Sequence, residues 1–352
     1  MGTETLNSEL QVKPSQLAAI LAKCITAKEP VLIAGAPGIG KSDIVEQAAR
    51  LADAELLVSH PVTSDPTDYK GLPALDIANH CAHFLPFGDL NRLIHADRLT
   101  ACFFDDLGHA PQAVQAALMQ LALARRVNGH KVSDHVVFIG ATNRRQDRAG
   151  VSGIIEPLKG RFMILHLAVD LIDFCTWAAR SGIESEVIAY ISLRPEALHK
   201  FEPTPDLINS PSPRGWARVS RYLKLGLTSD VQPQIFTGCV GQEHGVGFAA
   251  FLRIARSVVQ PAEVFKNPKG APIPNEPSAL WALVSALARR VATDTMDAYI
   301  VYMNRLMDTG RHGEYVMASV KQMLAREPSL QSGTAYTAAM SGPLGKLMLG
   351  GN

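Results

Sequence analysis

An eight-residue segment near the N-terminus has the composition and spacing of a phosphate-binding loop. It fits the pattern GxxxxGK[ST], with a short apolar run before it and a helical pattern after it. Glycines allow successive backbone N–H groups to face one phosphate, and the start of a helix adds a favourable field for anions. We expect Lys41 to contact the β- and γ-phosphates of ATP and Ser42 to bind Mg²⁺. The segment consists of Gly35, Ala36, Pro37, Gly38, Ile39, Gly40, Lys41 and Ser42.

Polar side chains also follow two further apolar runs that are typical of buried strands. Asp105 and Asp106 come after residues 101–104, and Asn143 comes shortly after residues 136–141. Beside a phosphate loop, we expect Asp105 to hold Mg²⁺, directly or through water, and Asp106 to orient or activate the attacking water. On a parallel neighbouring strand, Asn143 would lie beside the γ-phosphate. The alternatives are two solvated acids at a strand end and an asparagine that caps a turn.

A sheet is needed to bring these segments together. Short apolar runs alternate with helical patterns over the first half of the chain, which predicts an α/β domain with a parallel sheet flanked by helices. After about residue 168 the helical patterns dominate. The expected strands cover residues 31–34, 55–58, 100–104 and 136–141, and the expected helices cover residues 10–28, 41–53 and 111–125.

The ordered set of motifs resembles the AAA+ ATPases and, within them, the MoxR type. The similarity extends over roughly residues 14–225. The matching segments are the magnesium acid and the residues after it, the sensor-1 segment, the stretch that holds the arginine finger, and the start of the sensor-2 helix: residues 105–110 with 114–119, 141–144, 157–162 and 212–214.

This resemblance implies a ring, normally a hexamer, in which ATP binds between neighbouring subunits. Arg161 would reach the neighbour's ATP and stabilise charge in the transition state, which can be worth several powers of ten in rate. Arg214 would contact the γ-phosphate within its own subunit. Arg144, Arg145 and Arg148 are rival candidates for the arginine finger. Surface arginines or local salt bridges are the simpler alternative for both roles.

The change of pattern near residue 168 and the prolines after residue 260 divide the chain into three expected regions. Residues 1–168 would form the nucleotide-binding P-loop domain, and residues 169–259 would form an all-helical lid. Residues 260–352 would hold a proline-rich segment, a helical C-terminal extension and a flexible tail. Within this last region, we expect a loop at 260–277 and a loose tail at 328–352.

One position departs from the family pattern. The family normally has Glu where this chain has Asp106. A carboxylate on a side chain shorter by one methylene lies farther from the water, and a misplacement of about 1 Å can cost about 100-fold in rate. Slow hydrolysis, or the use of ATP mainly as a switch, follows as an alternative.

The stretch from residue 63 to residue 88 contains several prolines and glycines and is expected to be irregular. In AAA+ rings the matching region faces the central pore. Tyr69 and Lys70 are therefore candidates for gripping a polypeptide, and residues 84–87 for a second protruding hairpin. The alternative is an ordinary surface loop with one buried tyrosine.

His80, Cys81 and His83 stand close together in the same stretch. Their spacing is too tight for an ordinary zinc site, and no second pair of ligands follows in the sequence. An exposed or half-buried loop is therefore preferred over a metal site here.

Composition narrows the class of protein. The chain has 352 residues, 47% of them hydrophobic and 19% charged, which is typical of a globular protein. Lys and Arg number 34 against 33 Asp and Glu, so a large basic surface for nucleic acid is not indicated. The five cysteines form no CxxC pair, and neither a secretory signal nor a membrane-length apolar run is present. We expect a cytoplasmic protein with reduced thiols and no membrane partner.

Three functions are compatible with these features. The first is a chaperone-like remodelling ATPase, which by the resemblance would act with a partner that bears a von Willebrand factor A domain. The second is an assembly scaffold gated by nucleotide, with slow or no hydrolysis. The third is a nucleic-acid motor or loader, although no nucleic-acid-binding module is evident.

Overall fold

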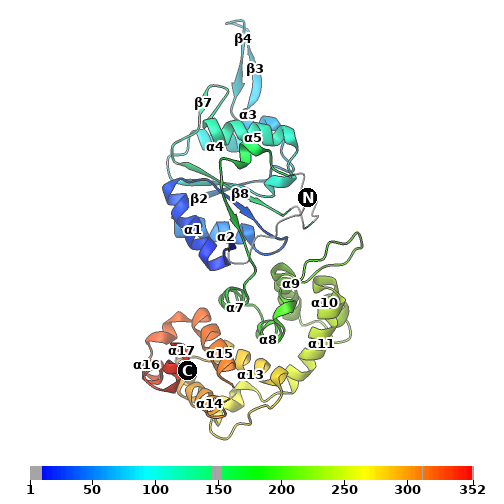
Figure 1. Ribbon diagram of the computed structural model, residues 1–352, viewed down its shortest axis with the longest axis vertical. Helices are drawn as coiled ribbons and strands as arrows, with labels where there is room; N and C mark the ends of the chain where they lie inside the picture. Colours follow the sequence, from blue (N-terminus) through cyan, green and yellow to red (C-terminus); the bar gives the residue numbers. More distant parts are fainter. Residues whose placement is uncertain (1–9, 145–146, 148–152, 311, 351–352) are drawn as a thin grey trace. The chain divides into compact units, whose positions relative to one another are not determined.

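A five-stranded parallel sheet with the order β2-β5-β8-β1-β9 forms the centre of the first part of the chain (Figure 1). The computed structural model describes residues 10–144, 147, 153–310 and 312–350. Every residue of the three inner strands is buried, which explains why they appear in the sequence as continuous apolar runs. The strands are β1 (Val31–Ala34), β2 (Glu55–Ser59), β5 (Thr100–Phe104), β8 (Val136–Thr142) and β9 (Met163–His166).

Helices cover both faces of this sheet (Figure 1). Successive residues of a strand point to opposite faces, so Phe103 and Ile139 join one core while Phe104 and Phe138 join the other. The first core also contains residues of α1 and α2, and the second contains residues of α3, α4 and α5. The α/β fold class predicted from the sequence is confirmed. The helices are α1 (Pro14–Ala27), α2 (Lys41–Leu51), α3 (Pro66–Lys70), α4 (Gly88–Ile94) and α5 (Gln112–Ala124).

A two-stranded antiparallel hairpin, β3 (Leu72–Asp76) and β4 (Cys81–Leu85), projects from this part of the chain (Figure 1). The expectation of an irregular segment over residues 63–88 is therefore wrong. Neither face of the hairpin is buried. Its sequence therefore lacks the alternation of apolar and polar residues that predicts a half-buried strand. Gly71 begins it with φ 85°, and a Cβ there would lie 2.7 Å from the carbonyl oxygen of Leu85.

Short elements complete this part of the chain and hold the base of the hairpin. The side-chain amide of Asn128 donates to the carbonyl of Lys70 at 2.7 Å, and Nε2 of His130 lies 2.8 Å from the carbonyl oxygen of Phe84. The elements are the turn of 3₁₀-helix η2 (Leu107–His109), β6 (Arg126–Val127), β7 (His130–Lys131) and α6 (Glu156–Lys159).

The chain divides into two compact units, the first holding residues 1–169 and 201–203 and the second holding residues 170–200 and 204–352. Among its described residues, the second unit is helical throughout and has no strand. Its helices are α7 (Leu171–Arg180), α8 (Ser185–Leu193), η4 (Pro195–Ala197), α9 (Pro213–Lys224), α10 (Gln232–Val240), α11 (Gln242–Ser257), α12 (Pro261–Lys266), α13 (Pro277–Arg290), η5 (Thr293–Thr295), α14 (Met296–Asp308), α15 (Gly313–Arg326), η6 (Pro328–Ser332), α16 (Thr334–Met340) and α17 (Pro343–Met348).

The end of the chain differs from the expected loose tail. Residues 328–348 form three short helices, and Leu330, Tyr336 and Leu344 are each at most 5% exposed. The many small residues suggested flexibility, but three well-spaced large apolar side chains are enough to anchor the segment. The expected loop at 260–277 is likewise interrupted by α12. No helix within the described residues is both long and apolar enough to cross a membrane.

Candidate nucleotide site

The GxxxxGK[ST] segment connects the end of β1 to the start of α2. Gly40 caps the N-terminus of α2 with φ 90°, and Gly38 has φ 73°. Both values lie in the region that glycine adopts without steric cost, so the chain can turn sharply just before the helix. The N-terminus of α2 therefore points into the loop, and Lys41 is the first residue of that helix.

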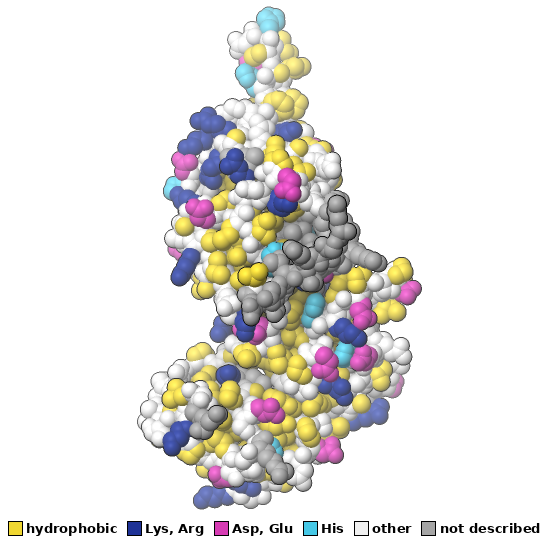
Figure 2. Space-filling model, viewed as in Figure 1, with side chains coloured by type: hydrophobic (Ala, Val, Ile, Leu, Met, Phe, Trp, Pro, Cys, Tyr) yellow, Lys and Arg dark blue, Asp and Glu magenta, His cyan; other side chains and the backbone are white. Residues whose placement is uncertain are grey.

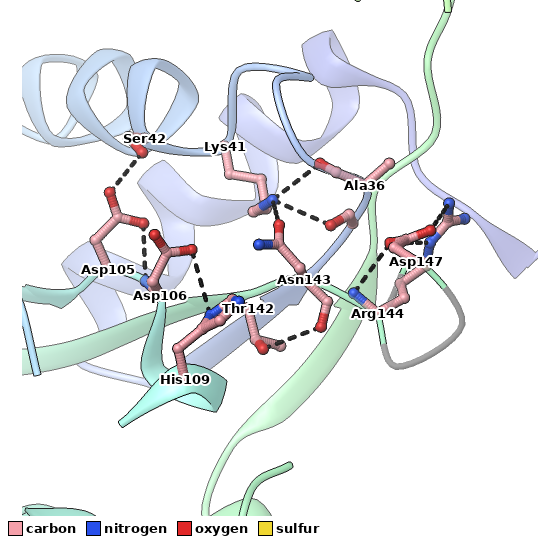
Figure 3. Close-up of polar contacts among 11 residues, drawn as sticks. Ala36, Lys41, Ser42, Asp105, Asp106, His109, Thr142, Asn143, Arg144 and Asp147 are labelled. Atoms are coloured by element: carbon pink, nitrogen blue, oxygen red, sulfur yellow. Dashed lines mark hydrogen bonds and ion pairs between the residues drawn. The ribbon is translucent and has the colours of Figure 1, made fainter. Parts of the chain in front are cut away.

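Lys41 is almost completely buried, at 7% exposure. Its ammonium donates to the carbonyl oxygens of Gly35 at 3.0 Å and Ala36 at 2.9 Å, and to Oδ1 of Asn143 at 2.7 Å (Figure 3). These oxygens carry only partial charges, so a phosphate oxygen that replaced any of them would bind the ammonium more strongly. The arrangement keeps a buried cation in place at the loop.

Ser42 and Asp105 meet across the interface between α2 and the end of β5. The hydroxyl of Ser42 donates to Oδ2 of Asp105 at 2.8 Å (Figure 3). The other carboxylate oxygen accepts from the backbone N–H of Asp106 at 3.0 Å. Two oxygens bound at adjacent positions of one octahedral Mg²⁺ lie about 2.9 Å apart, given bonds of roughly 2.0–2.1 Å. The hard oxygen donors and their separation therefore fit Mg²⁺.

Asn143 reaches Lys41 because β8 lies between β1 and β5. Ala34 of β1 pairs with Thr142 of β8, and Phe104 of β5 pairs with Gly140. The carboxyl ends of these parallel strands thus lie side by side. The structure brings Asn143 next to the lysine of the loop, whereas its place beside the γ-phosphate and its role in hydrolysis stay predictions.

Asp106 has an unusual backbone and a partner that the sequence did not suggest. Its φ of 53° places it in the left-handed region, where Asp is among the tolerated residues. Its side chain is 52% exposed, and its Oδ1 lies 3.8 Å from Nδ1 of His109, whose side chain is 16% exposed. Sequence reasoning missed His109. The available signal was a histidine three residues after an acid in the turn that follows a buried strand.

The candidate arginines differ in what holds them. Arg161 is exposed in the turn before β9. Arg214 is exposed in the first turn of α9. Ser212 caps this helix, and its hydroxyl accepts from the N–H of Gly215 at 3.2 Å. Arg214 belongs to the second unit, and the roles of Arg161 and Arg214 stay predictions.

Arg144 makes a two-pronged ion pair within its own chain. Its Nε and one terminal nitrogen donate to the carboxylate of Asp147 at 3.1 and 2.9 Å, and Asp147 is 4% exposed (Figure 3). An arginine locked on a buried acid is poorly suited to reach a neighbouring subunit. The other rival candidates, Arg145 and Arg148, lie outside the described residues.

Tyr69 is a core residue, so the expectation that it is exposed to grip a polypeptide is wrong. It is 5% exposed, and its hydroxyl lies 2.7 Å from the hydroxyl of Ser59 and 3.0 Å from that of Ser64. Its ring meets Phe104 edge to face at 6.2 Å. Burial raises the pKa of Tyr69. An aromatic ring with hydroxyl partners is more stable packed against the sheet than in water. Lys70, at the end of α3, is half-buried.

Exposed apolar side chains in this region instead lie on the hairpin (Figure 2). Leu75 and Ile77 are more than 80% exposed. Phe84 and Leu85, from the range 84–87 that was expected to protrude, belong to β4 of this hairpin and are also exposed, whereas Tyr69 is not part of it.

Neither a scan of protein-family models nor a search of curated proteins finds a match to this sequence. A variant of RuvB from Thermotoga maritima is similar in structure, with 17% identity over 84% of this chain and 86% of that chain and a TM-score of 0.40. NtrX from Brucella abortus with ADP shows 14% identity over 69% of this chain and 67% of that chain, with a TM-score of 0.35. For an ATPase from Cytophaga hutchinsonii, the identity is 13% over 69% of this chain and 82% of that chain, and the TM-score is also 0.35. Such low scores carry no conclusion about activity or partners.

Proposed function

We propose that this chain binds ATP with Mg²⁺ and hydrolyses ATP as one subunit of a ring-forming AAA+ motor of the MoxR type. The motor remodels or activates a partner protein complex, one member of which bears a von Willebrand factor A domain. The observation that carries the proposal is the convergence of Lys41, Ser42, Asp105 and Asn143 from three separate elements. The MoxR assignment and the partner rest on the resemblance in residues 105–110 and 157–162.

Each of these residues has a distinct part in binding. The N-terminus of α2 and the ammonium of Lys41 take the phosphates, which replace the carbonyl contacts of that ammonium. Ser42 and Asp105 would hold Mg²⁺, Asp105 directly or through water. Bound Mg²⁺ neutralises negative charge on the β- and γ-phosphates.

The residues at the ends of β5 and β8 position the attacking water. Asp106 accepts a hydrogen bond from the water and His109 orients the carboxylate, since the two side chains lie 3.8 Å apart. Asn143 keeps its amide beside Lys41, close to where the γ-phosphate binds. Arg161 from a neighbouring subunit stabilises the charge of the transition state, and Arg214 senses the γ-phosphate within its own subunit.

The test is steady-state phosphate release by the purified protein across a range of protein concentrations. Turnover per chain rises with concentration if the site is shared between subunits. Arg161→Ala lowers turnover by at least about 1000-fold while ATP still binds. The matched control is Arg50→Ala, because Arg50 is an exposed arginine in the last turn of α2 and should leave turnover unchanged.

A mixing experiment distinguishes a trans arginine from a local one. Lys41→Ala chains keep Arg161 but have a disabled site, and Arg161→Ala chains have an intact site without the arginine. Mixing the two variants restores part of the activity if Arg161 acts across the interface. No recovery, together with a turnover per chain that does not depend on concentration, contradicts the shared site.

A nucleotide-gated scaffold is the second candidate, and the position of Asp106 favours it. The carboxylate is half exposed and lies near His109, and it is shorter than the glutamate of the family. ATP binding and ATP-dependent assembly without phosphate release above the Lys41→Ala level would support the scaffold over the motor.

A further inference from the structure

Three side chains with metal-binding atoms meet on the projecting hairpin, away from the nucleotide site. Sγ of Cys81 lies 3.2 Å from Nε2 of His83, and Oδ2 of Asp76 lies 3.7 Å from the same nitrogen. One ligand atom from each residue falls within 4.8 Å of the other two, the only such group of His, Cys, Asp or Glu among the described residues. All three side chains are at least partly exposed, so an ion has access from solvent.

The strand register explains this convergence. Asp76 pairs directly with Cys81 across the hairpin, so their side chains share one face. His83 follows Cys81 by two residues on the same strand and therefore points to the same face. The residue opposite His83 is Ala74, whose methyl group leaves space beside the imidazole. The missing ligand of the tight Cys81–His83 pair thus comes from the other strand.

The contacts of His83 identify the kind of site. In a Cys–His–Asp catalytic triad, the thiol and the carboxylate bind opposite nitrogens of the imidazole. Here the sulfur and the carboxylate oxygen both lie nearest to Nε2. Three donor atoms that converge on one point can form one side of a metal coordination shell. They do not have the linear arrangement of a catalytic triad.

The distances agree with a tetrahedral ion. Bonds of roughly 2.3 Å to sulfur and 2.0–2.2 Å to nitrogen and oxygen place neighbouring ligand atoms about 3.3–3.6 Å apart. The two separations at Nε2, 3.2 and 3.7 Å, lie close to this range without any movement of the backbone. A thiolate, an imidazole and a carboxylate together select Zn²⁺ over Mg²⁺ or Ca²⁺.

The turn of the hairpin supports the carboxylate. The backbone N–H of Asn79 donates to Oδ1 of Asp76 at 3.1 Å, and the side-chain amide of Asn79 donates to Oδ2 at 2.8 Å. Hydrogen bonds of this kind orient ligands in known metal sites. We propose that Asp76, Cys81 and His83 form a binding site for Zn²⁺ or a similar thiophilic divalent ion, with the fourth position open to water or to a side chain of another molecule.

Binding at this place would stiffen the hairpin. An isolated two-stranded hairpin is marginally stable, and this one packs no face on the core. Metal binding that requires both strands in register adds its free energy to the folded hairpin. The proposal does not depend on ATP hydrolysis, and either one can fail without the other.

Titration of the full-length, tag-free protein with Co²⁺ tests the site. We expect one Co²⁺ per chain with a thiolate-to-cobalt absorption band in the near ultraviolet, and Zn²⁺ should displace it. Cys81→Ser should abolish the band, whereas the control Cys24→Ser should keep it. Co²⁺ bound at Ser42 and Asp105 would have oxygen ligands only and would produce no such band, so the two sites are distinguishable.

A second variant tests the supporting contact. Asn79→Ala should weaken Co²⁺ binding by about 10–100-fold while the thiolate band persists at saturation. The absence of a thiolate band at millimolar Co²⁺, or a band that survives in Cys81→Ser, would overturn the proposal. An affinity in Asn79→Ala equal to that of the wild type would overturn the supporting role of Asn79.

Discussion

The nucleotide site and the tip of the hairpin are two polar clusters with opposite construction. In the candidate nucleotide site, Lys41, Asp105 and Asn143 come from distant parts of the sequence. Asp105 and Asn143 directly follow β5 and β8, whose residues are all buried, and Lys41 is the first residue of α2, after the loop that follows the buried strand β1. At the hairpin tip, Asp76 and His83 are only seven positions apart, and every residue of β4 is exposed. The core positions the first cluster, and the register of two strands alone positions the second.

This difference shows that closeness in sequence and rigidity are separate properties. The cluster assembled from distant residues stands at the carboxyl edge of a sheet whose strands pack into two cores, so a displacement of those strands would disturb close packing. The local cluster has only its own turn and the contacts at its base to hold it. We therefore expect the first site to be rigid and the hairpin to be pliable.

Thiol labelling separates the two regions most strongly. Cys81 is exposed on the hairpin and should react quickly with a disulfide reagent, whereas Cys102 in β5 is 1% exposed. Burial raises the pKa of Cys102, so the thiol stays protonated and unreactive. Labelling of Cys102 should be at least about 1000-fold slower, because it requires opening of the sheet. Comparable rates, read by mass spectrometry of labelled peptides, would mean that the sheet is no more rigid than the hairpin.

Removal of the Lys41 ammonium should nearly abolish ATP turnover. Lys41→Ala removes the donor that we propose binds the phosphates, and the loss of one such preorganised donor costs about 100–1000-fold. Phosphate release is the measurement, and Lys23→Ala on the exposed surface of α1 is the control. Turnover that survives in Lys41→Ala would place the activity elsewhere in the preparation.

Lengthening the acid at the end of β5 should have a smaller effect in the opposite direction. Asp106→Glu should raise phosphate release by up to about 100-fold, if the shorter side chain holds the water about 1 Å too far away. Asp106→Asn should lower release, because the amide cannot accept a proton. An unchanged or lower rate in Asp106→Glu would show that Asp106 is already well placed with His109.

Stability should respond in the core and not on the hairpin. Tyr69→Phe removes the hydroxyl that contacts Ser59 and Ser64, and leaves the buried Ser59 without that partner. The expected loss is about 1–3 kcal/mol. Leu75→Ala on the hairpin should change stability by less than about 0.5 kcal/mol.

Hydrogen exchange of the β5 amides is the suitable readout for both variants. All three tryptophans, Trp177, Trp216 and Trp281, belong to the second unit, so their fluorescence does not report on the first. Equal losses of protection in Tyr69→Phe and Leu75→Ala would contradict the assignment of Tyr69 to the core.

The α/β fold class and the candidate residues of the nucleotide site could be predicted from the sequence. The inner strands are buried on both faces, and such strands appear as continuous apolar runs. The phosphate loop depends on contiguous residues whose backbone requirements are local, such as the positive φ of Gly40. The carboxyl ends of parallel strands share one edge of the sheet, so the strand assignments predicted that Asn143 would approach the loop if its strand were a neighbour. The folded sheet supplies that condition, because β8 lies between β1 and β5.

Features that depend on what surrounds a side chain could not be predicted from the sequence. From the sequence, Tyr69 could face either a pore or the core. In the folded chain the buried position is favoured, because the hydroxyls of Ser59 and Ser64 contact its hydroxyl and Phe104 packs against its ring. Asp76 lies opposite Cys81 because of the antiparallel register of β3 and β4. The sequence pattern of this exposed hairpin does not predict that register. Exposed segments and short anchored helices carry a weak hydrophobic signal. Their conformation is therefore set by contacts that become visible only in the folded chain.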